Sequence, residues 1–329
     1  MKPLSRWSSM TLPILFVLGA FPAFALAQAK LTLSHNAEAG TPRAVAALKF
    51  AELVSAKSGG KITVEVNPGG KLGENLEMLT SLRAGKLDMS INFHGTLATV
   101  VPEVAAFSLP YAFSSPKAVW EVLDGAVGQD LAGKIENQGL VALSWMDGGS
   151  YHISNNKRPI LKPEDLRGLR IRTTSDKAMM DTMSAWGAQP TPINFNDLYD
   201  AVKGGYVDGQ ENSLVNFKQK KLHDVQKHLA LTYHSYGLAP FLMNKAAWNK
   251  LSSDERKAIQ DAANEASALQ RKLSAEEEAK ILDEYKKAGT LQITTPNAAP
   301  FKAATQKIWD SWELKGFGAF VKKLRAASN

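Results

Sequence analysis

Two arginines in the segment 168–173 have the side chains best suited to hold a small anion. In the run Gly-Leu-Arg-Ile-Arg-Thr, Arg170 and Arg172 alternate with Leu169 and Ile171, so in a strand the arginines share one face. A guanidinium at a strand end can hold a carboxylate through two parallel hydrogen bonds, which a lysine cannot reproduce. Arg172 is nearer the strand end and is the candidate for this contact. The alternative is an arginine on a solvated strand face.

A second polar cluster follows Val207, at another expected strand end. Residues 208–212 read Asp-Gly-Gln-Glu-Asn. Gly209 permits an unusual backbone turn, while Glu211 and Asn212 bring hydrogen-bond donors and acceptors to one place. These features favour a binding site, although an ordinary polar loop has the same pattern.

Aromatic residues near these clusters are candidates for the walls of a pocket. Phe195 follows Pro-Thr-Pro at 190–192 and either forms a pocket floor or belongs to the core. Trp145 and Tyr151 flank the glycine pair 148–149. That pair is either a hinge beside a site or an ordinary linker between domains.

The sequence has none of the common catalytic signatures. It contains no cysteine, which removes thiol catalysis, thiolate metal sites and Fe–S clusters. There is no G-x-S-x-G elbow, no P-loop, no G-x-G-x-x-G after a strand and no H-E-x-x-H. Among six histidines only His223 and His228 lie close in sequence, and their spacing of five does not give a common helical face. We therefore expect no catalysis, no cofactor and no metal.

Composition and charge indicate an ordinary globular chain. Of the 329 residues, 44% are hydrophobic and 22% charged, and the formal net charge is +7. The basic residues are mostly scattered among acids, and no basic helix is interleaved with aromatics, so nucleic-acid binding is not expected. The mild positive excess can attract anionic solutes.

The elements that must position the candidate residues alternate between strands and helices. Strands are expected at 30–34, 61–66 and 87–93, with helices from Thr41 to Gly59 and over 74–84. A second unit of the same kind starts near Gly148, with strands at 169–173, 191–195 and 207–211 and helices at 177–186 and 197–203. This order predicts two α/β domains with parallel strands and a ligand cleft at the strand ends.

A long helix is expected after the second unit. Ser252 and Glu255 form a possible capping box, and helix-forming residues then continue to Gly289. Such a helix would be roughly 50 Å long and would lie across both domains. Two helices with a kink around Ser274 are the alternative.

The N-terminus has the pattern of a secretory signal peptide. Lys2 and Arg6 precede the apolar run 11–27, and small residues stand at Ala25, Ala27 and Ala29. Cleavage is expected after Ala27 or Ala29, with release into the periplasm. An uncleaved anchor is the alternative, but Pro13, Gly19 and Pro22 interrupt a run that is already short for a membrane span.

Several separate segments, in order along the chain, resemble the extracytoplasmic solute receptors of tripartite ATP-independent periplasmic (TRAP) transporters, the C4-dicarboxylate-binding type. The matching segments are 71–74, 82–89, 107–113, 155–159, 166–172, 187–192, 207–212 and 225–227. The resemblance implies a two-lobed receptor, expected to be a monomer, that closes on a small carboxylate and docks on a two-part membrane symporter. With the signal peptide at 1–29, it also implies a first lobe of 30–148 plus 238–277 and a second lobe of 149–237 plus 278–329.

The same resemblance implies roles for individual residues. Arg172 would pair with the ligand carboxylate, Asn212 would be a polar contact and Phe195 an apolar one. Asn36 and Glu74 would contribute from the first lobe. With Phe93, Trp145, Tyr151 and Glu211 they make a candidate site of nine residues.

Two positions depart from the family pattern and bear on the ligand. Many members have a second arginine where this chain has Tyr151, and often a polar residue near the position of Phe93. One cation fewer and two more rings favour a monocarboxylate with an apolar or aromatic body, packed on Phe93, Tyr151 and Phe195. A receptor of an ATP-driven importer, a ligand sensor for a signalling partner and a periplasmic enzyme of unknown type are the rival functions.

Overall fold

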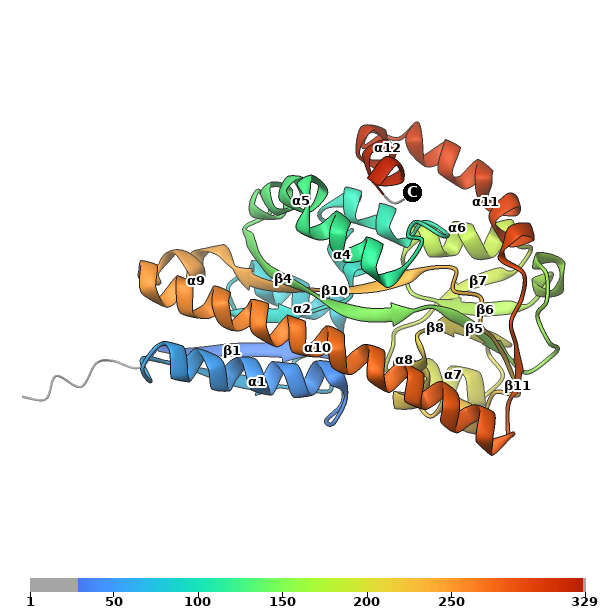
Figure 1. Cartoon of the computed structure of the whole chain (residues 1–329), viewed down its shortest axis with the longest axis horizontal. Coiled ribbons are helices and arrows are strands. Elements are labelled where there is room, and N and C mark those ends of the chain that lie inside the picture. The colour runs from blue at the N-terminus through green and yellow to red at the C-terminus, as the bar shows by residue number, and fades with distance from the viewer. Residues whose placement is uncertain (1–28, 328–329) are drawn as a thin grey trace, which may run out of the picture.

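The structure of the chain is a computed structural model that describes residues 29–327 (Figure 1). The predicted signal peptide lies outside the described residues, except for Ala29. Two sheets, of five and six strands, each carry helices. We call the part built on the five-stranded sheet the first lobe and the part built on the six-stranded sheet the second lobe. This is the two-lobed α/β class that the sequence predicts.

The first lobe has the strand order β2-β1-β3-β10-β4. Its strands are β1 (Ala29–His35), β2 (Ile62–Asn67), β3 (Met89–Ile91), β4 (Leu140–Ser150) and β10 (Tyr236–Asn244). β1 is parallel to β2 and β3, while β10 is antiparallel to both of its neighbours. The helical elements of this lobe are α1 (Pro42–Lys57), α2 (Asn75–Arg83), α3 (His94–Leu97), η1 (Pro102–Ser108), α4 (Pro116–Asp124), α5 (Ala126–Glu136) and α9 (Lys245–Asn249).

The second lobe has the strand order β11-β9-β5-β8-β6-β7. Its strands are β5 (His152–Asn155), β6 (Arg170–Thr173), β7 (Gln189–Pro192), β8 (Gly209–Asn212), β9 (His228–Ala230) and β11 (Gln292–Thr294). β6 is parallel to β7 and β8, whereas β5 is antiparallel to β8 and β9. Short helices connect them: η2 (Pro163–Leu166), α6 (Lys177–Ala185), α7 (Leu198–Lys203), α8 (Leu214–Gln219) and η3 (Leu222–Asp224).

Two long strands carry the chain between the lobes. β4 and β10 pair from Leu140 opposite Asn244 to Ser150 opposite Tyr236. Near the lobe boundary a Cβ on Gly148 would lie 2.7 Å from the carbonyl carbon of Gly237, so glycine is required for the strands to approach this closely. The predicted crossovers at the glycine pair and near Gly237 therefore lie side by side.

The helix α10 (Ser253–Ala288) is a single uninterrupted element of 36 residues. Its N-cap Ser252 accepts from the backbone of Glu255, which closes the predicted capping box, and Gly289 ends it in the left-handed conformation. It packs on α1 and β4 of the first lobe and on α8 of the second (Figure 1). The long helix across both lobes is confirmed, and the alternative of two helices is wrong.

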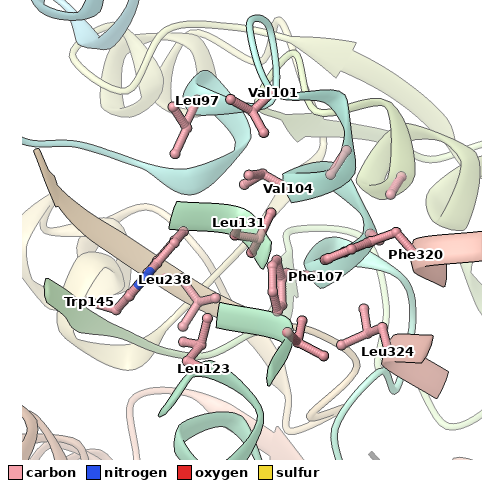
Figure 2. Packing of buried hydrophobic residues seen from close by; sticks show 14 of the residues in the cluster. Leu97, Val101, Val104, Phe107, Leu123, Leu131, Trp145, Leu238, Phe320 and Leu324 are labelled. Carbon is pink, nitrogen blue, oxygen red and sulfur yellow. The ribbon is translucent and has the colours of Figure 1, made fainter. Parts of the chain in front are cut away.

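The C-terminal helices contact both lobes. α11 (Ala298–Glu313) packs on α6, and α12 (Gly318–Ala327) packs on η1 and α5. Phe320 and Leu324 of α12 join the buried cluster of the first lobe around Phe107 (Figure 2). The sequence predicts that α11 and α12 belong to the second lobe, which is expected to include residues 278–329. These lobe limits stay a prediction.

Candidate ligand-binding site

Two adjoining cavities lie where strands of the two lobes end. Their volumes are about 130 and about 30 Å³, and both are lined by Phe93, Arg172 and Phe195. Glu74 and Asp176 are among the residues that line only the larger one. The smaller one is also lined by Asn36, Arg43, Tyr151, Asn212 and Asn216. Seven of the nine site residues predicted from the sequence thus line this space, all but Trp145 and Glu211.

Arg172 reaches the cavities from the end of β6. Arg172 is only 1% exposed, and its Nε donates to the carbonyl oxygen of Ile193 at 2.9 Å. Among the described residues it forms no salt bridge, and the hydrogen bond of its side chain is the one made by Nε. Burial lowers its pKa, and the neighbouring Glu211 counteracts this shift. A buried guanidinium without an ion pair is costly, and an anionic ligand would compensate it.

Arg170, the other arginine of the motif, does not line the cavities. Its Nη2 donates to Asp208 Oδ1 at 3.0 Å and to the carbonyl of Gly205 at 2.9 Å. Its side chain is 43% exposed. An arginine on a solvated strand face, the alternative considered for Arg172, is therefore found at Arg170. Arg172 itself is buried.

Four residues of the segment 208–212 form the buried strand β8 (Gly209–Asn212) and not a polar loop, while Asp208 lies just before the strand. Asn212 ends β8, and its Oδ1 accepts from Asn216 Nδ2 at 2.6 Å. Glu211 is fully buried behind the cavities, and its Oε2 lies 3.7 Å from Nε2 of His234. Neither carboxylate oxygen has a hydrogen-bond partner among the described residues. Burial raises the pKa of Glu211 to about 8, although Arg172 acts in the opposite direction.

Three aromatic rings form the apolar walls. Phe93 precedes α3 and Phe195 follows β7, so the two rings come from opposite lobes. Tyr151 lies between β4 and β5 and is 4% exposed. Burial is the main cause that raises the pKa of Tyr151, and Arg172 and Arg43 both act against the rise. The phenol is therefore within electrostatic range of both guanidinium groups.

The first lobe contributes polar groups that follow β1 and begin α2. Asn36 Nδ2 donates to Asn75 Oδ1 at 3.0 Å, and Asn36 Oδ1 accepts from Arg43 at 3.1 Å. Glu74 is the N-cap of α2, with its backbone nitrogen bound to Glu77 Oε2 at 2.8 Å. These groups face the second lobe across the cavities.

Hydrogen bonds and an ion pair join the lobes around the cavities. Ser108 Oγ donates to Asp176 Oδ2 at 2.6 Å. Gln219 Nε2 donates to the carbonyl of Asn36 at 3.4 Å, and Lys220 lies 3.9 Å from Glu38. The lobes are thus in contact on more than one side of the cavity space.

A search for related proteins places this architecture in a known family. The model of the bacterial extracellular solute-binding protein family 7 matches residues 33–315. The chain belongs to this family.

Individual relatives agree with the assignment. The uncharacterized protein y4mM of Sinorhizobium fredii is 42% identical to this chain. The match covers 85% of this chain but only 52% of the length of y4mM. The 2,3-diketo-L-gulonate-binding periplasmic protein YiaO of Escherichia coli is 31% identical, with 88% of this chain and 89% of YiaO covered. The crystal structure of a TRAP periplasmic solute-binding protein from Polaromonas sp. JS666, bound to D-erythronate, has a TM-score of 0.87. It is 31% identical and covers 91% of this chain and 99% of its own.

The family assignment confirms the resemblance noted in the sequence and the expectation of a binding protein without catalytic activity. Family 7 proteins are extracytoplasmic, and TRAP receptors of this kind bind small organic acids. In the part of the chain that is described, no helix is both long and apolar enough to cross a membrane. Residues 29–327 also contain no cluster of three or more side chains suited to hold a metal ion.

Trp145 does not reach the cavities of this family 7 protein. It is 7% exposed and packs with Phe107, with ring centroids 6.2 Å apart, in the core of the first lobe (Figure 2). Its backbone carbonyl accepts from Arg271 Nη2 at 2.8 Å. β4 places Trp145 several residues before the hinge, so closeness in sequence to the glycine pair did not bring it to the site.

Arg43, Asn75, Asp176 and Asn216 were not predicted from the sequence. Each stands in the first turn of a helix or at its N-cap: α1, α2, α6 and α8 respectively. Helix N-termini that follow the carboxyl ends of parallel strands are where this class of fold binds ligands, and that signal was available. Asp176 caps α6 by accepting from Ala178 at 2.9 Å, and burial raises its pKa to about 6.

Proposed function

We propose that this chain is the receptor of a TRAP transporter that captures a small organic acid through Arg172 and delivers it to a two-part membrane symporter. The single observation that carries the proposal is the buried guanidinium of Arg172, which lines both cavities without an ion pair among the described residues. A ligand carboxylate would supply the missing charge and use the free terminal nitrogens. The known ligands of relatives are consistent with this, because D-erythronate and 2,3-diketo-L-gulonate are organic acids.

The proposed ligand is a monocarboxylate with an apolar face. Phe93 and Phe195 lie on the two lobes and both line both cavities, while Tyr151 closes the smaller one. Burying the apolar face of a ligand between these rings stabilises the complex, because the rings themselves are removed from water. The small cavity volumes favour a ligand of few carbon atoms.

Capture would proceed by closure of the lobes about β4 and β10. The ligand contacts groups of both lobes, so it binds the closed form more tightly than the open one and shifts the population toward closure. Contacts such as Ser108 with Asp176 form only when the lobes meet. The membrane partner would then recognise the closed form.

A thermal-shift screen of the protein purified from the periplasm tests the proposal. The panel contains small monocarboxylates, dicarboxylates, sugars and amino acids. A ligand present at 100 times its dissociation constant stabilises the folded protein by about 2.7 kcal/mol. We expect monocarboxylates to raise the melting temperature of the wild type and of Arg170→Ala, but not of Arg172→Ala.

Arg170→Ala is the matched control, since it removes an arginine from the same strand that does not line the cavities. A response to uncharged sugars alone would contradict the proposal. So would a response of Arg172→Ala equal to that of the wild type.

A further inference from the structure

We propose that Arg43 is a second ligand-binding arginine, which recognises an oxygen group at the end of the ligand remote from its carboxylate. This inference rests on the proposed function, because it assumes that Arg172 holds the carboxylate. It assigns to the first lobe a specificity residue that faces the Arg172 of the second lobe. The ligand would accordingly be an organic acid that carries hydroxyl or carbonyl oxygens along its body.

Arg43 has an unsatisfied donor beside the smaller cavity. It is the second residue of α1, after Pro42, and it lines the smaller cavity together with Arg172. One terminal nitrogen donates to Asn36 Oδ1 at 3.1 Å. Its Nε is buried and has no hydrogen-bond partner among the described residues. A buried donor without a partner costs free energy, and a ligand oxygen would satisfy it.

The charge of Arg43 is likewise not neutralised by a salt bridge in residues 29–327. Burial lowers its pKa, and Tyr151 and Asp147 oppose the shift. Because Tyr151 also interacts with Arg172, the two guanidinium groups act on the same part of the cleft. Tyr151 stands where many family members carry a second arginine, and the sequence therefore predicted one cation fewer at the site. The structure nevertheless has a second arginine at the cavity, because Arg43 reaches it from α1.

The surroundings of Arg43 favour a neutral oxygen over a second carboxylate. Arg43 and Asp147 line a common recess next to the cavity, and Asp147 partly offsets the charge of the arginine. A second carboxylate would be repelled by the ionised form of Asp147, against which burial acts by raising the pKa of this group. The amides of Asn36, Asn75 and Asn216 also line the smaller cavity. Amides both donate and accept, which matches hydroxyl groups better than an acceptor-only carboxylate.

Titration calorimetry with three acids of equal chain length tests this assignment. The probes are butanoate, which has no further oxygen, a trihydroxybutanoate, and succinate. We expect the trihydroxybutanoate to bind at least about 10-fold more tightly than the other two. Arg43→Gln should weaken the trihydroxybutanoate by about 10- to 100-fold and leave butanoate almost unchanged, because only the hydroxylated acid uses the lost charged donor.

Two control variants separate the possible outcomes. Arg83→Gln removes an exposed arginine of α2 that does not line either cavity, and it should bind all three acids as the wild type does. A purely structural role of Arg43 would weaken all three acids by the same factor, and this result would overturn the inference. Tightest binding of succinate, with the greatest loss in Arg43→Gln, would overturn the assignment of a neutral oxygen.

The failure of this inference is distinguishable from the failure of the proposed function. If no acid binds, or if Arg172→Ala binds all three acids normally, the proposed function is wrong. If the acids bind and need Arg172 but Arg43→Gln changes none of them, only the role of Arg43 is wrong.

Discussion

The two lobes present their charged groups to the cavity from different kinds of element. In the second lobe Arg172 extends from a strand, and the residues of the neighbouring β8, including Gln210 and Glu211, are buried. In the first lobe Arg43 and Asn75 stand in the first turns of helices, and Asn36, in the loop between β1 and α1, hydrogen-bonds to both. A strand inside a sheet is fixed by backbone hydrogen bonds to the strands on both sides. The residues at a helix end can change without altering the hydrogen bonds of a sheet. The difference suggests a division of labour, with a fixed carboxylate contact in one lobe and selective contacts in the other.

The largest expected effect comes from removing the charge of the second lobe. Arg172→Met should weaken binding of any acid by at least about 100-fold, which corresponds to about 2.7 kcal/mol. The unfolding free energy without ligand should remain the same or rise on the order of 1 kcal/mol, because an unpaired buried cation is removed. Calorimetric titration and urea unfolding measure the two quantities. If the ligand-free variant lost several kcal/mol of stability, Arg172 would be a structural residue, and the contrast between the lobes would disappear.

A clash between the lobes should have the next largest effect. A Cβ on Gly95 would lie 2.5 Å from Cε1 of Phe93 in the same lobe and 2.7 Å from Oδ2 of Asp176 in the other. Gly95→Ala should therefore weaken binding by about 10-fold or more, because overpacking costs about 1–3 kcal/mol and part of it arises only on closure. Ligand affinity should fall by more than the stability of the ligand-free protein. Equal losses in the two measurements would mean that the lobes do not need to approach for binding.

The pH dependence of binding tests the buried carboxyl of the second lobe. Burial raises the pKa of Glu211 to about 8, so the folded protein keeps this proton at neutral pH. Above pH 8 the carboxylate would compete with the ligand for Arg172, and affinity should fall by up to about 10-fold per pH unit. Affinity should be nearly constant between pH 6.5 and 7.5. In Glu211→Gln the decline above pH 8 should be absent, and a decline that persists there would assign it to another group.

Glu278 of α10 provides a matched comparison at the hinge, with the smallest expected effect on ligand affinity. Burial raises its pKa to about 8 as well, and the nearby backbone N–H groups of Ser150 and Leu214 act against the rise. Its folded pKa lies above the usual 4.5, so the folded state holds more protons and the unfolding free energy falls as pH rises from about 4.5 to about 8. Glu278→Gln should remove this loss, which the two pKa values put at roughly 3–4 kcal/mol between pH 5 and pH 8, without changing ligand affinity at any pH. Thermal unfolding between pH 5 and pH 8 and titration at both values measure the two effects. A change of affinity would show that the hinge and the cavity are coupled.

Local patterns in the sequence were sufficient for much of the fold and part of the site. The alternation around Arg172, the capping box of α10 and the succession of strands and helices depend on neighbours in the chain. Arg172, Phe195 and Asn212 follow or end strands, so the rule that ligands bind at strand ends was enough to select them. Their role in binding stays a prediction.

Other features depended on how distant segments meet. Glu211 and Asn212 are adjacent in the chain, yet Asn212 lines the cavity and Glu211 is enclosed behind it. Trp145 is six residues from Tyr151 but belongs to the buried cluster of the first lobe, whereas Tyr151 lines the smaller cavity, because β4 runs away from the cleft for most of its length.

Periodicity indicated two α/β domains with an arginine at a strand end, and the resemblance of ordered segments to the TRAP receptors indicated a binding protein, because those signals are local and recur along the chain. Only the tertiary structure brought the N-terminus of α1 opposite that arginine. The insertion of β10 between β3 and β4 and the passage of two strands between the lobes set which helix ends face the cleft. Residues more than a hundred positions apart, such as Arg43 and Arg172, share one cavity for that reason, and no local pattern contains this information.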